Sequence, residues 1–230
     1  MNLQGKVTII TGAKGGLGTS VTQAFLAAGA TVVGVSRSIQ ASDFSHPEFH
    51  AMPAELSSGD AARKLAGDVV AQFGRIDAVV QVMGGFAGGK SVAETDDATL
   101  EKMLDLNYRS AFYIARAALP QMRQQGSGRI LVVASRQGVE PAPTVGAYSA
   151  SKAAVISLVR TIALENKDRG ISANTVLPGT MDTPGNRSWN PGGDANWVEP
   201  AQVAAMLVHL ASDEGAQITG AAIPIYGWQV

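Results

Sequence analysis

Residues 6–18 read KVTIITGAKGGLG, and this stretch decides the fold. Its β-branched first half predicts a buried strand over 6–11. The apolar periodicity of 17–28, followed by Gly29, predicts a helix that begins directly after the glycines. A strand, a glycine-rich turn and a helix in this order open a βαβ unit, so we expect a parallel sheet to begin here.

The rest of the chain repeats this alternation of short apolar runs and helical stretches. Further strands are expected at 31–36, 50–53, 77–83, 129–134, 171–177 and 222–226, and helices at 58–73, 96–125, 146–167 and 200–212. No full crossover helix is expected over 37–50, which is short and contains Pro47, and Pro120 is the expected position of a bend in the longest helix. Apolar strands separated by helices predict an α/β fold: a single-domain Rossmann-type doubly wound parallel sheet with helices on both faces, over residues 1–230.

Composition narrows the functional classes. Of 230 residues, 46% are hydrophobic and 16% are charged, and the net charge is −1, so we expect a compact protein that binds neither nucleic acid nor a membrane surface. The chain has no cysteine and its three histidines show no ligand spacing, so no metal site is predicted. The N-terminal residues do not resemble a signal peptide, and no apolar run reaches the roughly 18 residues that span a bilayer, so a cytoplasmic location is expected.

The glycine-rich turn predicts a binding site for a dinucleotide. Its glycines let the backbone turn tightly and approach a pyrophosphate, while the N-terminus of the following helix favours negative charge. The expected contacts come from Gly12, Lys14, Gly16, Leu17 and Gly18.

The end of the second strand predicts which dinucleotide is bound. This position normally meets the adenosine ribose, and an acidic residue there binds the 2′-hydroxyl of NAD. The chain has Ser36 and Arg37 instead. Because Arg37 can bind a 2′-phosphate through its fork of donors, with help from Lys14, we predict that NADP(H) is preferred over NAD(H).

A second group of residues predicts acid–base chemistry. Tyr148 and Lys152 lie four residues apart in YSASK, so a helix places the phenol and the ammonium on one face. A nearby positive charge lowers the pKa of a phenol, which would let Tyr148 work as a general acid or base near neutral pH. Ser135 follows an apolar run, and its hydroxyl can reach the same pocket.

In this order and spacing the motifs resemble the short-chain dehydrogenase/reductase family along nearly the whole chain. The matching features are TGAKGGLG at 11–18, Asn107 in LDLNYRSAF, Ser135, YSASK at 148–152 and LPGTMDT at 177–183. The resemblance implies that Tyr148 is the general acid in reduction and the base in oxidation. It implies that Lys152 holds the nicotinamide ribose and lowers the tyrosine pKa, and that Ser135 binds the substrate carbonyl oxygen. Asn107 would bend its helix locally and hold a water that links Lys152 to solvent.

Further cofactor contacts follow from the same resemblance. Thr183 and the backbone after Pro178, at Gly179, would bind the nicotinamide carboxamide. Near the adenine, Glu55 stands where the family usually has an aspartate, and it is followed by Leu56. The remaining expected cofactor contact is at Gly84.

Two segments depart from the family's usual pattern. Gln81-Val82-Met83-Gly84 stands where the family carries Asn-Asn-Ala-Gly, so Gln81 or a different bonding pattern must tie the central sheet together. The glycine-rich run 84–89 is similar to the corresponding segment of dihydropteridine reductases, a compact branch of the family. Those enzymes generally lack the catalytic serine, whereas this chain has Ser135.

The segment 180–199 is rich in Gly, Asn, Pro and Trp. Irregular segments of this length in compact domains are often lids, so residues 184–199 are expected to cover the substrate, with Trp189 and Trp197 as the apolar surface.

Three side chains near the expected pocket have open roles. Arg136 either binds an acidic substrate or makes a surface ion pair. Tyr226 and Trp228 either border the pocket or pack at a subunit contact. The family resemblance favours a homotetramer or homodimer, with a contact built from the long helices at 96–125 and 146–167.

The leading functional hypothesis is an NADPH-dependent oxidoreductase that reversibly reduces a small-molecule carbonyl to an alcohol, with Tyr148 as general acid/base. One alternative is a dihydropteridine-reductase-like enzyme, and Ser135 discriminates between the two. The other is a non-catalytic NADP(H)-binding regulator, against which the retained Tyr148 and Lys152 argue. The identity of the substrate stays open.

Overall fold

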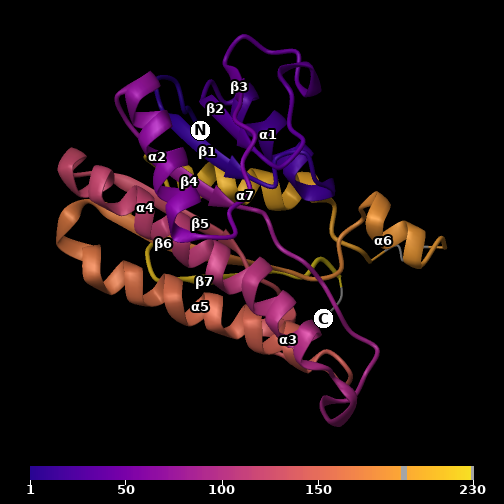
Figure 1. The fold of residues 1–230 in the computed structure, drawn as a ribbon. Helices are drawn as coiled ribbons and strands as arrows, with labels where there is room; N and C mark the ends of the chain where they lie inside the picture. Colours follow the sequence, from indigo (N-terminus) through magenta and orange to yellow (C-terminus); the bar gives the residue numbers. More distant parts are fainter. Residues whose placement is uncertain (193–195, 229–230) are drawn as a thin grey trace.

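The computed structural model of the chain describes residues 1–192 and 196–228, with the side chain of Trp189 left out. It contains a parallel sheet with the strand order β3-β2-β1-β4-β5-β6-β7 (Figure 1). The strands are β1 (Val7–Thr11), β2 (Thr31–Val35), β3 (Phe49–Ala51), β4 (Ala78–Gln81), β5 (Gly128–Val133), β6 (Ile171–Pro178) and β7 (Ala222–Ile225). This order reverses direction between β1 and β4, as a doubly wound sheet requires.

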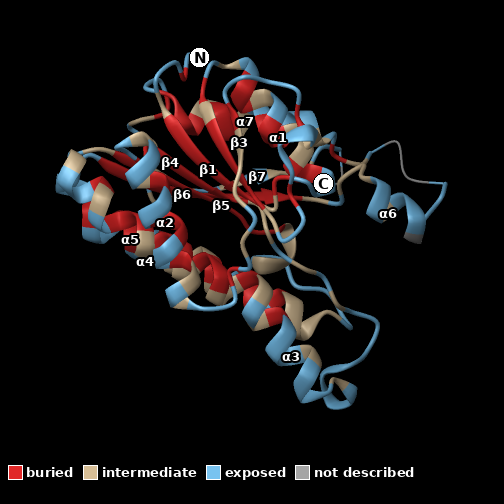
Figure 2. Cartoon of the chain, turned by 45° about the horizontal axis from the view of Figure 1, so that its top comes forward, coloured by how far each residue is buried: buried red, intermediate tan, exposed pale blue. Residues whose placement is uncertain are grey.

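Helices cover both faces of this sheet. They are α1 (Gly16–Ala27), α2 (Gly59–Phe73), α3 (Asp97–Met103), α4 (Ser110–Gln125), α5 (Gly146–Asn166), α6 (Pro184–Trp189) and α7 (Pro200–Ala211). One apolar cluster packs α2, α4 and α5 on one face, and a second packs α1 and α7 on the other. Figure 2 shows the buried strands enclosed between these two layers. The predicted fold class is therefore confirmed.

The predicted elements differ from the observed ones in two segments, 96–125 and 180–199, and agree in the segment after β2. The long helix expected over 96–125 is divided by a π-helical turn, η3 (Leu104–Arg109), whereas α4 continues through Pro120. The segment after β2 forms only the short 3-10 turn η1 (Ala41–Asp43), as its length suggests. The segment expected to be irregular over 180–199 contains the six-residue helix α6.

The remaining short turns are η2 (Val92–Glu94), η4 (Arg136–Gly138) and η5 (Lys167–Arg169). None of the helices within 1–192 and 196–228 combines the length and apolar character that a membrane span needs.

Gln81 replaces the family's sheet-binding asparagine by bridging three elements. The side chain is 1% exposed, and its Oε1 accepts a hydrogen bond of 2.7 Å from Thr11 Oγ1 at the end of β1. Its Nε2 donates to Ser110 Oγ at 2.9 Å and to the Met83 carbonyl at 3.2 Å. The Thr11 hydroxyl in turn accepts from the Met83 amide at 3.2 Å. Gln81 therefore fixes the ends of β1 and β4 and the start of α4 relative to one another.

Gln81→Met tests this bridge, because it keeps the side-chain length and removes both polar atoms. Buried partners on Thr11, Met83 and Ser110 would lose hydrogen bonds, so the free energy of unfolding should fall by about 2–4 kcal/mol in urea denaturation. The matched control is Gln124→Met on the exposed side of α4, expected to change it by less than about 0.5 kcal/mol. A loss under about 1 kcal/mol for Gln81→Met would contradict the bridging role.

Candidate active site

The candidate site lies at the carboxyl ends of β1, β4 and β5, where the strand order reverses. In open α/β sheets, ligands bind in the crevice formed at this point because the loops after neighbouring strands diverge. The loop after β1 and the loop after β4 touch here. A Cβ built on Gly12 would lie 2.8 Å from the Met83 amide nitrogen.

The first βα turn requires its glycines for steric reasons. Gly12 has φ of 67°, which L side chains rarely adopt. A Cβ on Gly18 would lie 1.9 Å from the Gly12 carbonyl oxygen, so no larger residue fits without moving the turn. A Cβ on Gly16 would lie 3.0 Å from Cβ of Thr183, which places the glycine turn directly beside the loop after β6. Leu17 is buried beneath the turn.

The end of β2 holds the predicted adenosine-ribose residues. Arg37 is exposed, and its Nη1 lies 4.0 Å from the Glu55 carboxylate. Lys14 donates at 3.4 Å to the Ser38 carbonyl and lies 2.9 Å from the Asp43 carboxylate of η1. Both cations thus stand near the end of β2 with an acidic neighbour. Leu56 is buried in the core.

Ser36 carries a polar atom that the fold leaves unsatisfied. Its Oγ is buried and has no hydrogen-bond partner within the described part of the chain. Buried hydroxyls are usually paired, so an unpaired one at the ribose end of the crevice fits a ligand that supplies the partner.

The predicted catalytic residues come together at the ends of β5 and α5. Ser135 follows β5 and is 8% exposed; its Oγ accepts from the Gln137 amide at 3.2 Å. The Ser135 hydroxyl lies near enough to the Tyr148 phenol to lower its pKa. Lys152 is 6% exposed, and its Nζ donates to the Val133 carbonyl at 2.9 Å and lies 5.9 Å from the centre of the Tyr148 ring.

Burial controls the protonation of this group. It raises the pKa of Tyr148 above its ordinary value, and the hydrogen bond with Ser135 opposes the rise. It also lowers the pKa of Lys152 to about 8. The sequence predicts a lowered tyrosine pKa, but desolvation of the phenol outweighs the other influences in this arrangement. Tyr148 is therefore a protonated phenol at neutral pH, as a free tyrosine is, and it holds this proton more tightly than a free tyrosine does.

Asn107 lies in the π-helical turn and joins three parts of the site. Its Nδ2 donates to Ser151 Oγ at 2.9 Å and to the Gly85 carbonyl at 3.1 Å, and its Oδ1 accepts from the Gly85 amide at 2.9 Å. Ser151 Oγ donates to the Tyr148 carbonyl at 2.7 Å. The extra residue of a π turn redirects side chains, and here it turns Asn107 toward the loop after β4. Asn107 therefore positions that loop against α5.

Gly84 lies between this network and Lys152, the predicted catalytic lysine. A Cβ at Gly84 would lie 2.8 Å from Asn107 Oδ1 and 3.3 Å from Lys152 Nζ. The glycine thus lets the backbone after β4 pass directly over both side chains.

The loop after β6 reaches the glycine turn, where Thr183 lies beside Gly16. Pro178 ends β6, and the Gly179 amide donates to the Ile225 carbonyl at 3.0 Å. Thr183 Oγ1 accepts from the Asn186 amide at 3.3 Å and so caps α6.

The expected lid is only partly described. The Val198 amide donates to the Thr180 carbonyl at 2.8 Å, and the Asp182 amide donates to the Val198 carbonyl at 2.9 Å, so the segment between them is closed at its base. Its helix α6 stands away from the body of the molecule (Figures 1 and 2). Residues 193–195 and the Trp189 side chain lie outside the described part, while Trp197 is half-buried.

The sequence left two roles open for Arg136, and the structure shows it in a surface ion pair. Its Nε donates to Glu140 at 2.7 Å, and its guanidinium lies 4.9 Å from the centre of the Tyr226 ring. The C-terminal Tyr226 thus packs on the segment after β5, whereas Trp228 is 81% exposed.

Two residues at the site were not predicted from the sequence. The Phe86 ring lies edge-on to the Tyr148 ring, with 5.0 Å between the centres. Ser151 links Asn107 to the backbone of Tyr148. Phe86 could have been found from the sequence, because it is the one aromatic residue within the glycine-rich run 84–89. Ser151 has no distinguishing feature in the sequence beyond its place in YSASK.

Comparison with known proteins identifies the class. The family of short chain dehydrogenases matches residues 6–193. The chain is 31% identical to 3-oxoacyl-[acyl-carrier-protein] reductase FabG of Thermotoga maritima, over 99% of this chain and 98% of that protein. It is also 31% identical to D-threitol dehydrogenase of Mycolicibacterium smegmatis, over 98% and 93% of the two chains. A short-chain type dehydrogenase/reductase from Mycobacterium ulcerans shares the fold, with a TM-score of 0.91, 23% identity and coverage of 100% and 91%.

The chain therefore belongs to the short-chain dehydrogenase/reductase family and is an oxidoreductase of that family. Enzymes of this family use nicotinamide cofactors. The close glycine turn, the unpaired Ser36 hydroxyl and the exposed cations at the end of β2 fit such a dinucleotide. The resemblance to dihydropteridine reductases drawn from residues 84–89 is not supported by these comparisons.

The buried ammonium of Lys152 makes stability depend on pH. The pKa falls from 10.5 to about 8 on folding, so the folded state disfavours the charged form and is destabilised below pH 8. Between pH 8 and 10.5 the unfolded chain binds more protons at this lysine than the folded chain does. The free energy of unfolding therefore rises over this range, by about 3 kcal/mol in total. Between pH 8 and 10, the free energy of unfolding should rise more steeply in the wild type than in Lys152→Met. Lys102→Met, which removes an exposed ammonium, should retain the wild-type slope; equal slopes in all three proteins would refute the assignment.

Proposed function

We propose that this protein is an NADPH-dependent reductase of small-molecule carbonyl compounds, acting reversibly as an alcohol dehydrogenase. The observation that carries the proposal is the convergence of the buried Ser135 hydroxyl and the Tyr148 ring beside the buried ammonium of Lys152, which lies 5.9 Å from the ring centre. A hydroxyl pair of this kind can bind one carbonyl oxygen and deliver one proton to it.

Each side chain has a defined part in the reaction. The bound cofactor supplies the hydride to the carbonyl carbon. Ser135 donates a hydrogen bond to the carbonyl oxygen, where negative charge develops, and Tyr148 donates its phenolic proton to that oxygen to complete the alcohol. Lys152, fixed by the Val133 carbonyl, supplies positive charge beside the phenol and a donor for the ribose. Asn107 holds the loop after β4 in place for these groups.

The cofactor would lie along the crevice from β2 to β6. Gly12, Gly16 and Gly18 allow the pyrophosphate to approach the start of α1, while Ser36 and Arg37 face the adenosine ribose. Glu55 and Leu56 border the adenine end. Thr183, with Pro178 and Gly179, would hold the nicotinamide end beside Gly84 and Lys152.

The catalytic assignment predicts separate losses for two substitutions. Tyr148→Phe removes the proton donor and should lower kcat for carbonyl reduction by about 10²–10⁴-fold. Ser135→Ala should lower it by about 10²–10³-fold, because one donor to the developing negative charge is lost. Steady-state NADPH oxidation with a panel of ketones, quinones and β-ketoacyl thioesters provides the measurement.

The same variants discriminate the alternatives. A dihydropteridine-reductase-like enzyme would turn over quinonoid dihydropterin and tolerate Ser135→Ala. A non-catalytic regulator would bind the cofactor and show no turnover in the wild type. Unchanged turnover of every substrate by Tyr148→Phe would mean that the phenol is not the proton donor.

The predicted preference for NADP(H) depends on Arg37. Its guanidinium is exposed and lies 4.0 Å from Glu55, so it can turn to a 2′-phosphate at little cost. Arg37→Asp should shift the ratio of kcat/KM for NADPH over NADH by about 100-fold toward NADH, because charge-assisted hydrogen bonds are replaced by repulsion. Arg169→Asp, before the start of β6 and away from the crevice, is the control and should leave the ratio unchanged. A wild type that binds NAD(H) as tightly as NADP(H) would exclude the preference.

We further propose that the enzyme works in the cytoplasm as a homodimer or homotetramer. The outer face of α5 carries small exposed side chains at Ala150, Ala153 and Ser157, and Leu164 is 67% exposed. Small residues allow two helices to approach closely, which suits a contact between copies of this helix. The segment 184–199 is proposed as the substrate lid.

A further inference from the structure

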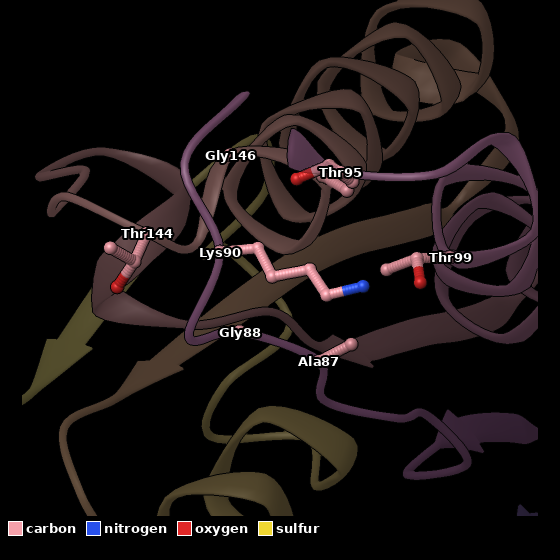
Figure 3. A pocket seen from close by; sticks show the side chains of 8 residues that line it. Ala87, Gly88, Lys90, Thr95, Thr99, Thr144 and Gly146 are labelled. Carbon is pink, nitrogen blue, oxygen red and sulfur yellow. The ribbon is translucent and has the colours of Figure 1, made fainter. Parts of the chain in front are cut away.

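A cavity of about 90 Å³ lies between the segment after β4 and the beginning of α5 (Figure 3). Lys90, Thr95, Thr99 and Thr144 form its polar wall, and Ala147 of α5 also lines it. Ala147 directly precedes Tyr148, so the cavity begins one residue from the proposed proton donor.

Phe86 joins the cavity to the catalytic group. Its ring centre lies 5.0 Å from that of Tyr148. A Cβ built on Gly88, which lines the cavity, would lie 3.0 Å from Cζ of Phe86. The Phe86 ring therefore contacts both the Tyr148 ring and the wall of the cavity at Gly88.

Lys90 is the only charged residue among those that line the cavity. Its Nζ lies 3.2 Å from Asp96 Oδ2, and Figure 3 shows the side chain extended toward Thr99. Asp96 caps α3, since its Oδ1 accepts from the Thr99 amide at 2.7 Å, so its position is set by that helix. An ammonium has three donors, and one bond to Asp96 leaves two for a ligand.

The opposite wall is held rigidly. Thr144 has φ of 65°, a left-handed conformation that is unusual for a β-branched residue. The Gly89 amide donates to the Thr144 carbonyl at 2.9 Å, which ties the segment after β4 to the segment before α5. Strained residues at the edge of a catalytic group are maintained only where the surroundings hold them in place, so this wall keeps a defined shape.

We propose that this cavity is a subsite for the carboxylate of an acidic carbonyl substrate, and that Lys90 is its specificity-determining residue. The inference rests on the proposed carbonyl reduction and adds the class of substrate. A carboxylate would accept hydrogen bonds from the two remaining Lys90 protons and lie beside the threonine side chains, while its carbonyl end lies at Tyr148.

The test compares two aldehydes of nearly equal shape, 4-formylbenzoate and the uncharged 4-formylbenzamide. Isothermal titration of both into the enzyme, with and without saturating NADP⁺, measures binding without turnover. The wild type should bind the benzoate about 10-fold more tightly, and added salt should weaken this preference because Lys90 is partly exposed. Lys90→Met should bind both compounds equally, Lys90→Arg should retain the preference, and Lys102→Met on α3 is the matched control for loss of one positive charge.

The outcomes distinguish the proposed subsite from the proposed carbonyl reduction. Equal binding of the two aldehydes by the wild type, or a preference that survives Lys90→Met, would overturn the subsite. Detectable binding of neither compound would overturn it too. NADPH-dependent turnover is measured separately: turnover of both aldehydes without the preference supports carbonyl reduction and refutes the subsite. Selective binding lost in Lys90→Met, without turnover of any carbonyl, supports the subsite and refutes the proposed reaction.

Thr144→Val gives a second readout on the opposite wall. It removes the hydroxyl and keeps the β-branched shape, so it should weaken binding of the benzoate by about 3-fold and leave the benzamide unchanged. Equal weakening of both compounds would point to a change in cavity shape and would count against a polar subsite.

Discussion

The buried amide of Gln81 is the interaction on which the site depends. Parallel strands diverge at their carboxyl ends, so the loops that build the crevice need a fixed point between them. Gln81 provides it through Thr11 on one side and Ser110 on the other. The glycine turn is thereby held relative to the π-helical turn that carries Asn107. A glutamine is one methylene longer than asparagine, and this reach suits it to bridge β1 and α4 from β4.

Close backbone approach is the second constraint, and it explains why glycine stands where loops meet. At Gly12 and Gly84 the backbone passes so close to neighbouring atoms that a Cβ would collide with them. Gly12 lies in the turn after β1, and Gly84 lies in the loop after β4. At Gly84 those atoms belong to Asn107 and Lys152, so the loop that closes over the crevice also covers the catalytic ammonium. The proposed dinucleotide site and the proposed acid–base group consequently share one wall.

Burial gives this acid–base group its character. Lys152 is taken out of water and compensated by a neutral carbonyl, which costs stability and lowers the pKa of its ammonium. The same desolvation raises the pKa of the Tyr148 phenol. The cations at the end of β2 are in the opposite situation, since they are largely exposed and can leave their acidic neighbours for a phosphate.

The sequence by itself determined the order of strands and helices along the chain and the glycine turn, and it predicted Ser135, Tyr148 and Lys152 as the catalytic set. Local spacing suffices for these, because apolar periodicity defines each element and a separation of four residues defines one helical face. Only the tertiary structure decided the hydrogen-bond partners of Gln81 and the direction in which the pKa of Tyr148 is shifted. It also decided the π-helical turn at Asn107 and the cavity beside Lys90. These depend on residues tens of positions apart that meet only after the sheet has formed, and on burial, which no local pattern encodes.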